Sequence, residues 1–499
     1  MTKPSDDLDD SPPHVIVNMP PAAAFVEMAP ASFMTPENPS FKRAGLKVIA
    51  MNRFKEAGGV SSSSVSPFQT WTAPVEVPDK PEQLFIGDRL LHRIAVKFPL
   101  TSRLAWVNGT MPELAKACTA SAPLGFVDAM LRGTSQVIIV NNSLSGLLIL
   151  LALFLPSRPD DPAAWAAAAH VGFAGFLSLL GATAFATYAG IDNHGVQAGL
   201  FGYNGLLVGL GLATFLDGGW DVEGAKILIL SPCLGAISVI LQCGLGNLLV
   251  PTFKCPPFTL AFNFTMIWFV LGSASKFSHF HVRSVLAPAI STLGTAADAM
   301  AYTPSACAEL HSLHLVWVLR ASFTSIGQIF LCGSWPAGLL IFIGAFFCSR
   351  IMASALLLGA LLAVLLSLLL GVPCAEISFG LWGYNSALTA TAVVTFFVPT
   401  RMSIAMAALG VLLTVILDGA FKQSMAPLGA PAGTLPFCVA AVLLVLAQGK
   451  LPGFDAVPLA DVSTPEDHFI SIRTDASLAS PSSPRKSVIL AKQKRAFKD

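Results

Sequence analysis

Charged residues are scarce in this sequence: Asp, Glu, Lys and Arg make up 12% of its 499 residues. An ordinary soluble domain carries about 25% of such residues. The charges that are present concentrate in residues 1–115 and 449–499, so the middle of the chain is more apolar than the average. This distribution excludes a typical soluble domain and predicts a membrane-embedded centre.

Several function classes lack their chemical signature here. The formal net charge is +1, which provides no concentrated basic face for nucleic acid. The nine cysteines include no CxxC pair, and most lie in apolar runs, where we expect small buried hydrophobic side chains. No nucleophile–base pair or cluster of metal ligands occurs in the apolar segments. We therefore predict no nucleic-acid partner, no metal or cofactor, and no enzymatic activity.

Ionisable side chains are also few inside the apolar segments. Most of those present lie near segment ends: Asp192, Asp217, Glu223, Lys226, Arg350, Glu376 and Lys422. An ion-coupled carrier or a proton relay normally needs buried Asp, Glu or His. Their scarcity favours a passive route across the membrane.

From residue 133 the chain is apolar almost without interruption, and about ten membrane spans are expected. Crossing about 30 Å of hydrocarbon takes about 20 apolar residues in a helix. The expected spans lie near 136–156, 164–189, 197–216, 226–250, 257–275, 314–333, 335–370, 379–398, 402–419 and 431–448. The segment 335–370 is long enough to contain more than one element. The fold class predicted is an all-α polytopic membrane protein.

The chain contains an internal repeat. Residues 199–205 and 380–386 share the pattern GLxGYN, which is hard to obtain twice by chance. Two more pairs follow the same order in both halves: 135–138 with 327–330, and 258–262 with 433–437. Duplicated halves of a membrane bundle usually place a site at their interface, near the bilayer midplane.

The repeat predicts which polar residues meet at that interface. Gln136 with Gln328, and Thr259 with Thr434, are candidates to face each other across a pseudo-two-fold axis. A path lined by Gln, Thr and backbone carbonyls, without charge, suits a neutral polar solute. About five spans per half would invert the second repeat and leave both tails on the cytoplasmic side.

Helix-breaking residues interrupt the apolar sequence after each of these glutamines, at 141–146 and 333–338. Such breaks are typical of half-helices that enter the membrane and turn, since irregular backbone is tolerated there only against protein or a cavity. A kinked ordinary helix is the alternative.

The domain organisation follows from these patterns. Residues 1–110, rich in Pro, Ser and charge, are expected to form a disordered cytoplasmic tail. The first repeat, 111–275, begins with an amphipathic lead-in and includes a pore helix, and the loop 276–312 connects it to the second repeat, 313–448. Residues 449–499 are expected to form a cytoplasmic C-terminal tail.

The motifs resemble those of the urea transporter family. Residues 131–137 with the following Val140-Asn141-Asn142 are similar to its first pore-helix region, and the doubled GLxGYN resembles its paired signature. Residues 258–262 and 431–437 resemble its repeated LPxxTxPF motif. The resemblance extends over about residues 111–455, the whole membrane part.

The resemblance implies two inverted repeats, each with five spans and one tilted half-spanning pore helix. It implies a homotrimer in the plasma membrane, with a pore for passive urea permeation through each subunit. It places Thr259 and Thr434 at the narrow centre of the path, with Gln136 and Gln328 as the polar residues of the pore helices. The further pore-lining or motif positions are Val137, Ile139, Tyr203, Asn204, Phe258, Ile329, Tyr384 and Asn385.

The predicted partners are urea and the lipid bilayer. Urea can slide edge-on between apolar walls while its N–H groups exchange water for a row of oxygens, because burying them unpaired would cost several kcal/mol. Ile139 stands where the family often has an aromatic wall residue. The alternative is therefore a channel for another small neutral solute, such as a short amide, ammonia or water.

Overall fold

The computed structural model describes residues 107–275, 280–282 and 315–468. Most of the predicted N-terminal tail, most of the loop 276–312 and the chain after 468 lie outside these residues. Within the described ranges the regular structure is helical, and extended pairing is limited to two isolated β-bridges.

Two series of seven helices follow one another after a short leading helix, α3 (Pro112–Cys118). The first series is α4 (Ala122–Gln136), α5 (Ser143–Ala152), α6 (Pro162–Tyr188), α7 (Asn193–Gln197), α8 (Tyr203–Phe215), α9 (Val222–Phe253) and α10 (Leu260–Ser275). The second is α14 (Leu315–Gln328), α15 (Trp335–Cys348), α16 (Arg350–Leu369), α17 (Cys374–Ser378), α18 (Tyr384–Phe396), α19 (Arg401–Met425) and α20 (Leu435–Leu446). Among the described residues, short 3-10 helices lie at Ala426–Leu428 and Leu459–Asp461.

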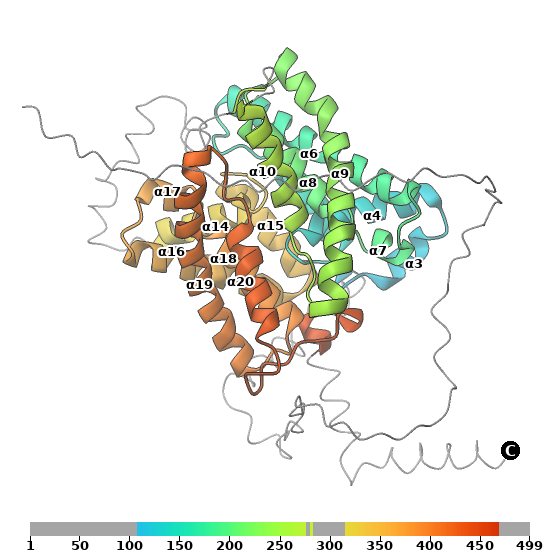
Figure 1. The fold of residues 1–499 in the computed structure, drawn as a ribbon, viewed down its shortest axis with the longest axis vertical. Helices are drawn as coiled ribbons and strands as arrows, with labels where there is room; N and C mark the ends of the chain where they lie inside the picture. The colour runs from blue at the N-terminus through green and yellow to red at the C-terminus, as the bar shows by residue number, and fades with distance from the viewer. Residues whose placement is uncertain (1–106, 276–279, 283–314, 469–499) are drawn as a thin grey trace, which may run out of the picture. The chain divides into compact units, whose positions relative to one another are not determined.

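The two series pack in the same way. In the first, α6 contacts α8 and α9, and α10 contacts both α8 and α9; in the second, α16 contacts α18 and α19, and α20 contacts both α18 and α19. In Figure 1 the first series runs from blue to green and the second from yellow to red. The series meet through α5 with α15 and through α10 with α20. The duplication expected from the sequence is therefore present in the fold.

Helix lengths differ from the uniform spans expected. Four described helices are long and apolar enough to cross a membrane: Pro162–Tyr188, Val222–Phe253, Arg350–Leu369 and Arg401–Leu428. Five apolar helices are shorter: Ser143–Ala152, Tyr203–Phe215, Leu260–Ser273, Trp335–Cys348 and Leu435–Leu446. The expected span 136–156 begins at the last residue of α4 and contains only the short helix α5, and 335–370 contains α15 and α16, separated at Ser349. A helix of 10 residues, such as α5, rises only about 15 Å, about half of the hydrocarbon thickness.

The breaks after α4 and α14 have the same geometry. Ile139 and Leu331 adopt left-handed backbone conformations, with φ of 64° and 56°. The next amide donates back to the helix in each case, from Val140 to the Ser135 carbonyl at 3.2 Å and from Cys332 to the Gly327 carbonyl at 3.1 Å. This pattern closes a helix end and redirects the chain.

Glycine permits the helix that follows each break to approach its predecessor. A Cβ on Gly146 would overlap the carbonyl oxygen of Leu131, and a Cβ on Gly338 would overlap that of Phe323. The pairs α4–α5 and α14–α15 therefore touch through backbone, as membrane helices commonly do at small residues. The breaker segments predicted from the sequence, 141–146 and 333–338, begin in these turns and continue into the first turns of α5 and α15.

The chain after α20 packs on the bundle before the described part ends. Phe397 forms a β-bridge with Ala456, and its ring stacks on Phe454 with centroids 3.9 Å apart. The first half has the matching bridge between Leu216 and Val282. The region expected as a C-terminal tail thus begins with a packed segment.

Candidate functional site

Thr259 and Thr434 lie in contact, although 175 positions separate them in the sequence. Thr259 immediately precedes α10, and Thr434 is the N-cap of α20. Their hydroxyl oxygens are 2.6 Å apart, and both side chains are buried. The interface between the two halves therefore contains the threonine pair that the repeat predicts.

Two further polar side chains, one helical turn later, complete this group. The Asn263 amide donates to the Thr434 hydroxyl at 2.9 Å, and the Thr434 backbone N–H donates to the Asn263 carboxamide oxygen at 2.9 Å. The Cys438 sulfur lies 3.2 Å from the Thr259 hydroxyl. Both are buried. We call Thr259, Asn263, Thr434 and Cys438 the threonine cluster.

Asn263 and Cys438 were missed in the sequence, although each lies four residues after its threonine. Side chains separated by four residues share one face of a helix, so this spacing was the available signal. The two residues differ in type, and a comparison of the halves by identity therefore passes over them.

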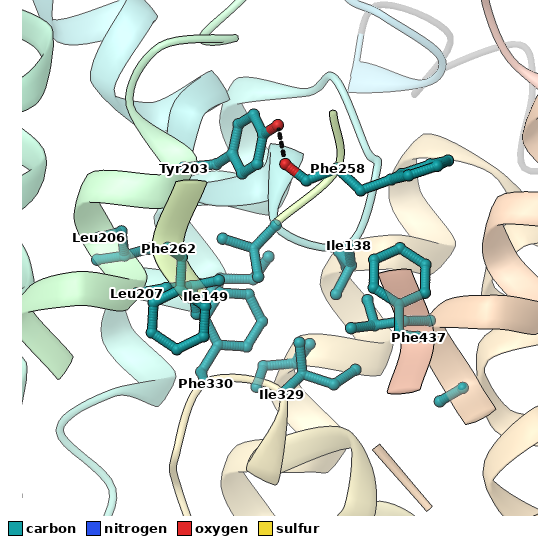
Figure 2. Close-up of a cluster of buried hydrophobic side chains, with 14 of the residues drawn as sticks. Ile138, Ile149, Tyr203, Leu206, Leu207, Phe258, Phe262, Ile329, Phe330 and Phe437 are labelled. Carbon is teal, nitrogen blue, oxygen red and sulfur yellow. Dashed lines mark hydrogen bonds between the residues drawn. The ribbon is translucent and has the colours of Figure 1, made fainter. Parts of the chain in front are cut away.

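Aromatic side chains are the sequence neighbours of the cluster in both halves, since Phe258 precedes Thr259 and Phe437 precedes Cys438. The Phe258 ring meets Phe437 edge-on with centroids 5.3 Å apart, and meets Phe396 at 5.6 Å. Figure 2 shows Phe258 and Phe437 near Ile138 and Ile329, side chains drawn from both halves. The four buried side chains of the cluster are uncharged, and these buried apolar side chains lie beside them in the sequence or in the same core.

The tyrosines and asparagines of the two GLxGYN motifs hold the turns that precede the threonines. Tyr203 donates to the Phe258 carbonyl at 2.6 Å (Figure 2), and Tyr384 donates to the Gly433 carbonyl at 2.6 Å. Phe258 and Gly433 both have left-handed backbone, with φ of 48° and 54°.

The asparagine of each motif donates to the same carbonyl as its tyrosine. The distance is 3.4 Å for Asn204 to Phe258 and 3.2 Å for Asn385 to Gly433. These motif side chains therefore act on backbone, and their contacts are those of positioning residues.

The glutamines lie apart from the threonines at the ends of α4 and α14. Gln136 donates to the Ala198 carbonyl at 3.0 Å. Gln328 has its amide nitrogen close to Gly333, in the turn that follows α14. Within the described residues no hydrogen bond joins either glutamine to the threonine cluster. Val137 and Ile329, the next residues, are buried.

Two charged groups are buried near the break after α4. Arg132 donates to Asp128 at 2.8 Å, and also to Asn141 and to the carbonyls of Thr110 and Met111. Ser143 donates to the second oxygen of Asp128. This closed network ties α4 to the preceding segment and to the turn before α5, which is a structural task.

A second buried carboxylate, Asp418, lies inside α19. It accepts a hydrogen bond from Asn385 at 2.8 Å. Asp418 was not predicted as a buried charge from the sequence, because a single carboxylate changes the average hydropathy of a strongly apolar helix very little.

The described residues contain no group of three His, Cys, Asp or Glu side chains that could hold a metal ion. Cys255, Cys332, Cys348 and Cys438 are buried free thiols, as expected for small hydrophobic residues. Cys374 departs from that expectation, since it is disulfide-bonded.

Comparison with known proteins places both halves in one family. The family model described as "Urea transporter" matches residues 127–449. Urea transporter 1 of Ovis aries is 30% identical over 379 residues, which cover 74% of this chain and 90% of that protein. Urea transporter 1 of Mus musculus is 30% identical over 375 residues, with 74% and 89% covered. The range matched by the family model includes the whole threonine cluster.

Proposed function

Because this chain belongs to the urea transporter family and transports urea passively across a membrane, we propose that urea passes between α10 and α20 at the threonine cluster. The observation that carries this proposal is the contact of the Thr259 and Thr434 hydroxyls at 2.6 Å, at the junction of the two repeats. Such junctions are where duplicated transporters place their substrate path.

The chemistry of the cluster matches urea. Hydroxyl oxygens accept from N–H groups, while the Asn263 amide donates to an oxygen and is able to serve the urea carbonyl. When a solute enters the cluster, the hydrogen bond between the two hydroxyls is replaced by hydrogen bonds from the hydroxyls to the solute. The polar atoms of the solute therefore stay paired although they are buried. The absence of a charged side chain from the cluster keeps each step weak, which rapid exit requires.

The paired elements support a path built by two similar halves. Gln136 and Gln328 end α4 and α14, where the chain turns through left-handed residues. Buried side chains follow them directly. We assign these turns to the flanks of the path, with the glutamines offering amide groups on either side of the threonines.

The inverted arrangement of the repeats belongs to this proposal. The segments that flank the bundle attach at neighbouring residues between α15 and α16. The Gly109 N–H donates to the Cys348 carbonyl at 3.0 Å, and the Ser349 hydroxyl donates to Glu466 at 2.6 Å. This supports one common side for both flanks, hence an even total number of crossings, and about five crossings in each half would satisfy that total and invert the second repeat. The cytoplasmic orientation, the plasma membrane and the homotrimer are proposed from the family resemblance.

The function is tested by flux into proteoliposomes, measured by stopped-flow light scattering. Urea, thiourea, acetamide, ammonia and glycerol are compared with and without an ion gradient. Fast, non-saturating urea flux that is independent of the gradient is expected. Fast passage of another solute without urea flux would contradict urea as the substrate but would leave the proposed path in place. A requirement for an ion gradient would contradict the passive mechanism.

A further inference from the structure

The two GLxGYN motifs are anchored by different side chains. In the first half the anchor is Gln242 of α9, which is buried. Its carboxamide oxygen accepts from the Asn204 amide at 2.6 Å, and its nitrogen donates to the Leu200 carbonyl. One neutral side chain thus satisfies a motif side chain and a motif carbonyl at once.

In the second half two charged residues share this task. Asp418 of α19 accepts from the Asn385 amide at 2.8 Å, and the Lys422 ammonium donates to the Leu381 carbonyl at 2.7 Å. Asn385 and Leu381 occupy the motif positions of Asn204 and Leu200. The residue four positions after Gln242 is Gly246, so the first half has no counterpart of Lys422.

The two charges of the pair differ in exposure, since Asp418 is buried and Lys422 is half-buried. Asp418 is fully buried, and its Oδ2 has no hydrogen-bond partner within the described ranges. Lys422 lies one turn along the same helix and interacts with Asp418 electrostatically. Its ammonium is 3.8 Å from the centre of the Trp382 ring, and Trp382 donates to Glu376 at 2.7 Å.

The contacts lead from this pair to the threonine cluster in two steps. Asn385, held by Asp418, donates to the Gly433 carbonyl at 3.2 Å, next to the 2.6 Å bond from Tyr384. Gly433 is the left-handed residue directly before Thr434. A displaced Asn385 therefore removes one of the two hydrogen bonds that hold the turn before Thr434.

We propose that Asp418 and Lys422 are a positioning pair for Thr434, dividing between two charges the task that Gln242 performs alone for Thr259. This inference rests on the proposed function. Neither residue contacts the cluster itself, so both act through Asn385 and Leu381. The carboxylate holds the Asn385 amide more firmly than a neutral acceptor would, because charge-assisted hydrogen bonds are stronger.

The test transplants the first-half arrangement into the second half. Asp418→Leu removes the acceptor of one Asn385 N–H and one of the two carboxylates that act on Lys422. Asp418→Gln combined with Lys422→Gly recreates the Gln242 and Gly246 arrangement. Gln242→Leu is the matched change in the first half. Urea and thiourea fluxes are measured for each full-length variant, normalised to the monodisperse protein recovered from the liposomes.

Asp418→Leu is expected to lower urea flux about tenfold, the factor for one lost hydrogen bond to a charged group. The double variant is expected to regain most of this flux, and Asp418→Leu is expected to change the ratio of urea to thiourea flux. A purely structural role would lower both solutes equally, through less folded protein. If Asp418→Leu does not fold, the double variant alone decides: near-normal urea flux supports the pair's role, and strongly reduced flux in well-folded protein overturns it.

Failure of the inference and failure of the proposed function give different results. Unchanged flux in a well-folded Thr434→Val protein would remove the threonine cluster from the path. A lowered flux in Thr434→Val together with wild-type flux and ratio in Asp418→Leu would retain the path and overturn the positioning pair alone.

Discussion

At the residue scale, the same backbone turn before each threonine is achieved with different residues. Phe258 adopts a left-handed conformation with a side chain, which costs about 1–2 kcal/mol and is held by the hydrogen bond from Tyr203. Gly433 adopts it without that cost, and leaves room for Asn263 beside it. The glycine is therefore needed for the space it leaves as well as for its conformation.

Gly433→Ala is predicted to disturb the threonine cluster. The added Cβ would overlap the Asn263 carboxamide oxygen, which accepts from the Thr434 N–H. Gly429→Ala is the matched control, because Gly429 also has positive φ, 63°, but nothing lies within 4 Å of its added Cβ. Gly433→Ala should lose about 1–2 kcal/mol more stability than the control, the worth of a displaced buried hydrogen bond. Thermal unfolding in detergent measures the difference, and equal losses would contradict the assigned contact.

Sequence analysis found the residues that the two halves share and missed those in which they differ. Thr259 and Thr434 were accessible because the motif around them is repeated. Asn263 faces Cys438 across the halves, and Gln242 is replaced by a pair that begins at Asp418. The residue type differs between the halves at both positions. A comparison of the two repeats by identity therefore does not find these residues, and only the folded structure shows their contacts.

At the scale of elements, the short helices depend on glycines where two backbones touch. The sequence predicted breaks at 141–146 and 333–338, and these segments overlap the turns before α5 and α15 and the first residues of both helices. It predicted half-helices at these breaks, but it did not predict that the runs at 197–216, 257–275 and 431–448 would also form helices too short to span. Hydrophobicity gives the length of a run, whereas left-handed residues such as Ile139 and Leu331 decide where the helix ends.

Gly338→Ala is predicted to separate α14 from α15. The added Cβ would overlap the Phe323 carbonyl, which belongs to the backbone and has little freedom to move. The expected loss of stability is about 3 kcal/mol, at the upper end for overpacking. Gly244→Ala is the control within α9, where nothing lies within 4 Å, and alanine there should stabilise by about 0.5–1 kcal/mol. Opposite shifts in the unfolding midpoint are expected, and a stabilising shift for both would contradict the packing.

At the scale of the whole molecule, the chain after α20 returns to the junction of α15 and α16. Glu466 accepts from the Ile351 N–H at 3.1 Å and from the Ser349 hydroxyl at 2.6 Å. A carboxylate at this position is favoured, because the first amides of α16 present partial positive charge. His468 closes the same segment by accepting from the Ser463 N–H at 2.8 Å through Nε2.

Docking of this segment is predicted to depend on pH. Burial lowers the pKa of His468 below its ordinary value of about 6.5, although the neighbouring Asp467 acts in the opposite direction. Because its pKa is lowered, His468 binds fewer protons in the docked segment than in the released one. Its contribution to docking is therefore fully present above about pH 6.5 and is lost as the pH falls toward the pKa of the docked state. Protonation also removes the acceptor for Ser463.

Hydrogen exchange over residues 463–468 measures this effect. Protection should decrease as the pH is lowered through this window, after correction for the intrinsic exchange rate. His468→Gln, which does not titrate, should show no such decrease. A similar pH dependence in the variant would assign the effect to another group, such as Glu466.

The central claim, that urea passes the paired hydroxyls of Thr259 and Thr434, is tested most directly by stopped-flow urea flux through Thr434→Val and Thr434→Ser proteoliposomes. Valine keeps the shape of threonine and removes the hydroxyl, whereas serine keeps the hydroxyl. Thr434→Val should reduce urea flux about tenfold, the cost of leaving one polar group of the solute unpaired, with unfolding temperature and assembly unchanged. Thr434→Ser should retain most of the flux. Wild-type flux in a well-folded Thr434→Val protein would contradict the account.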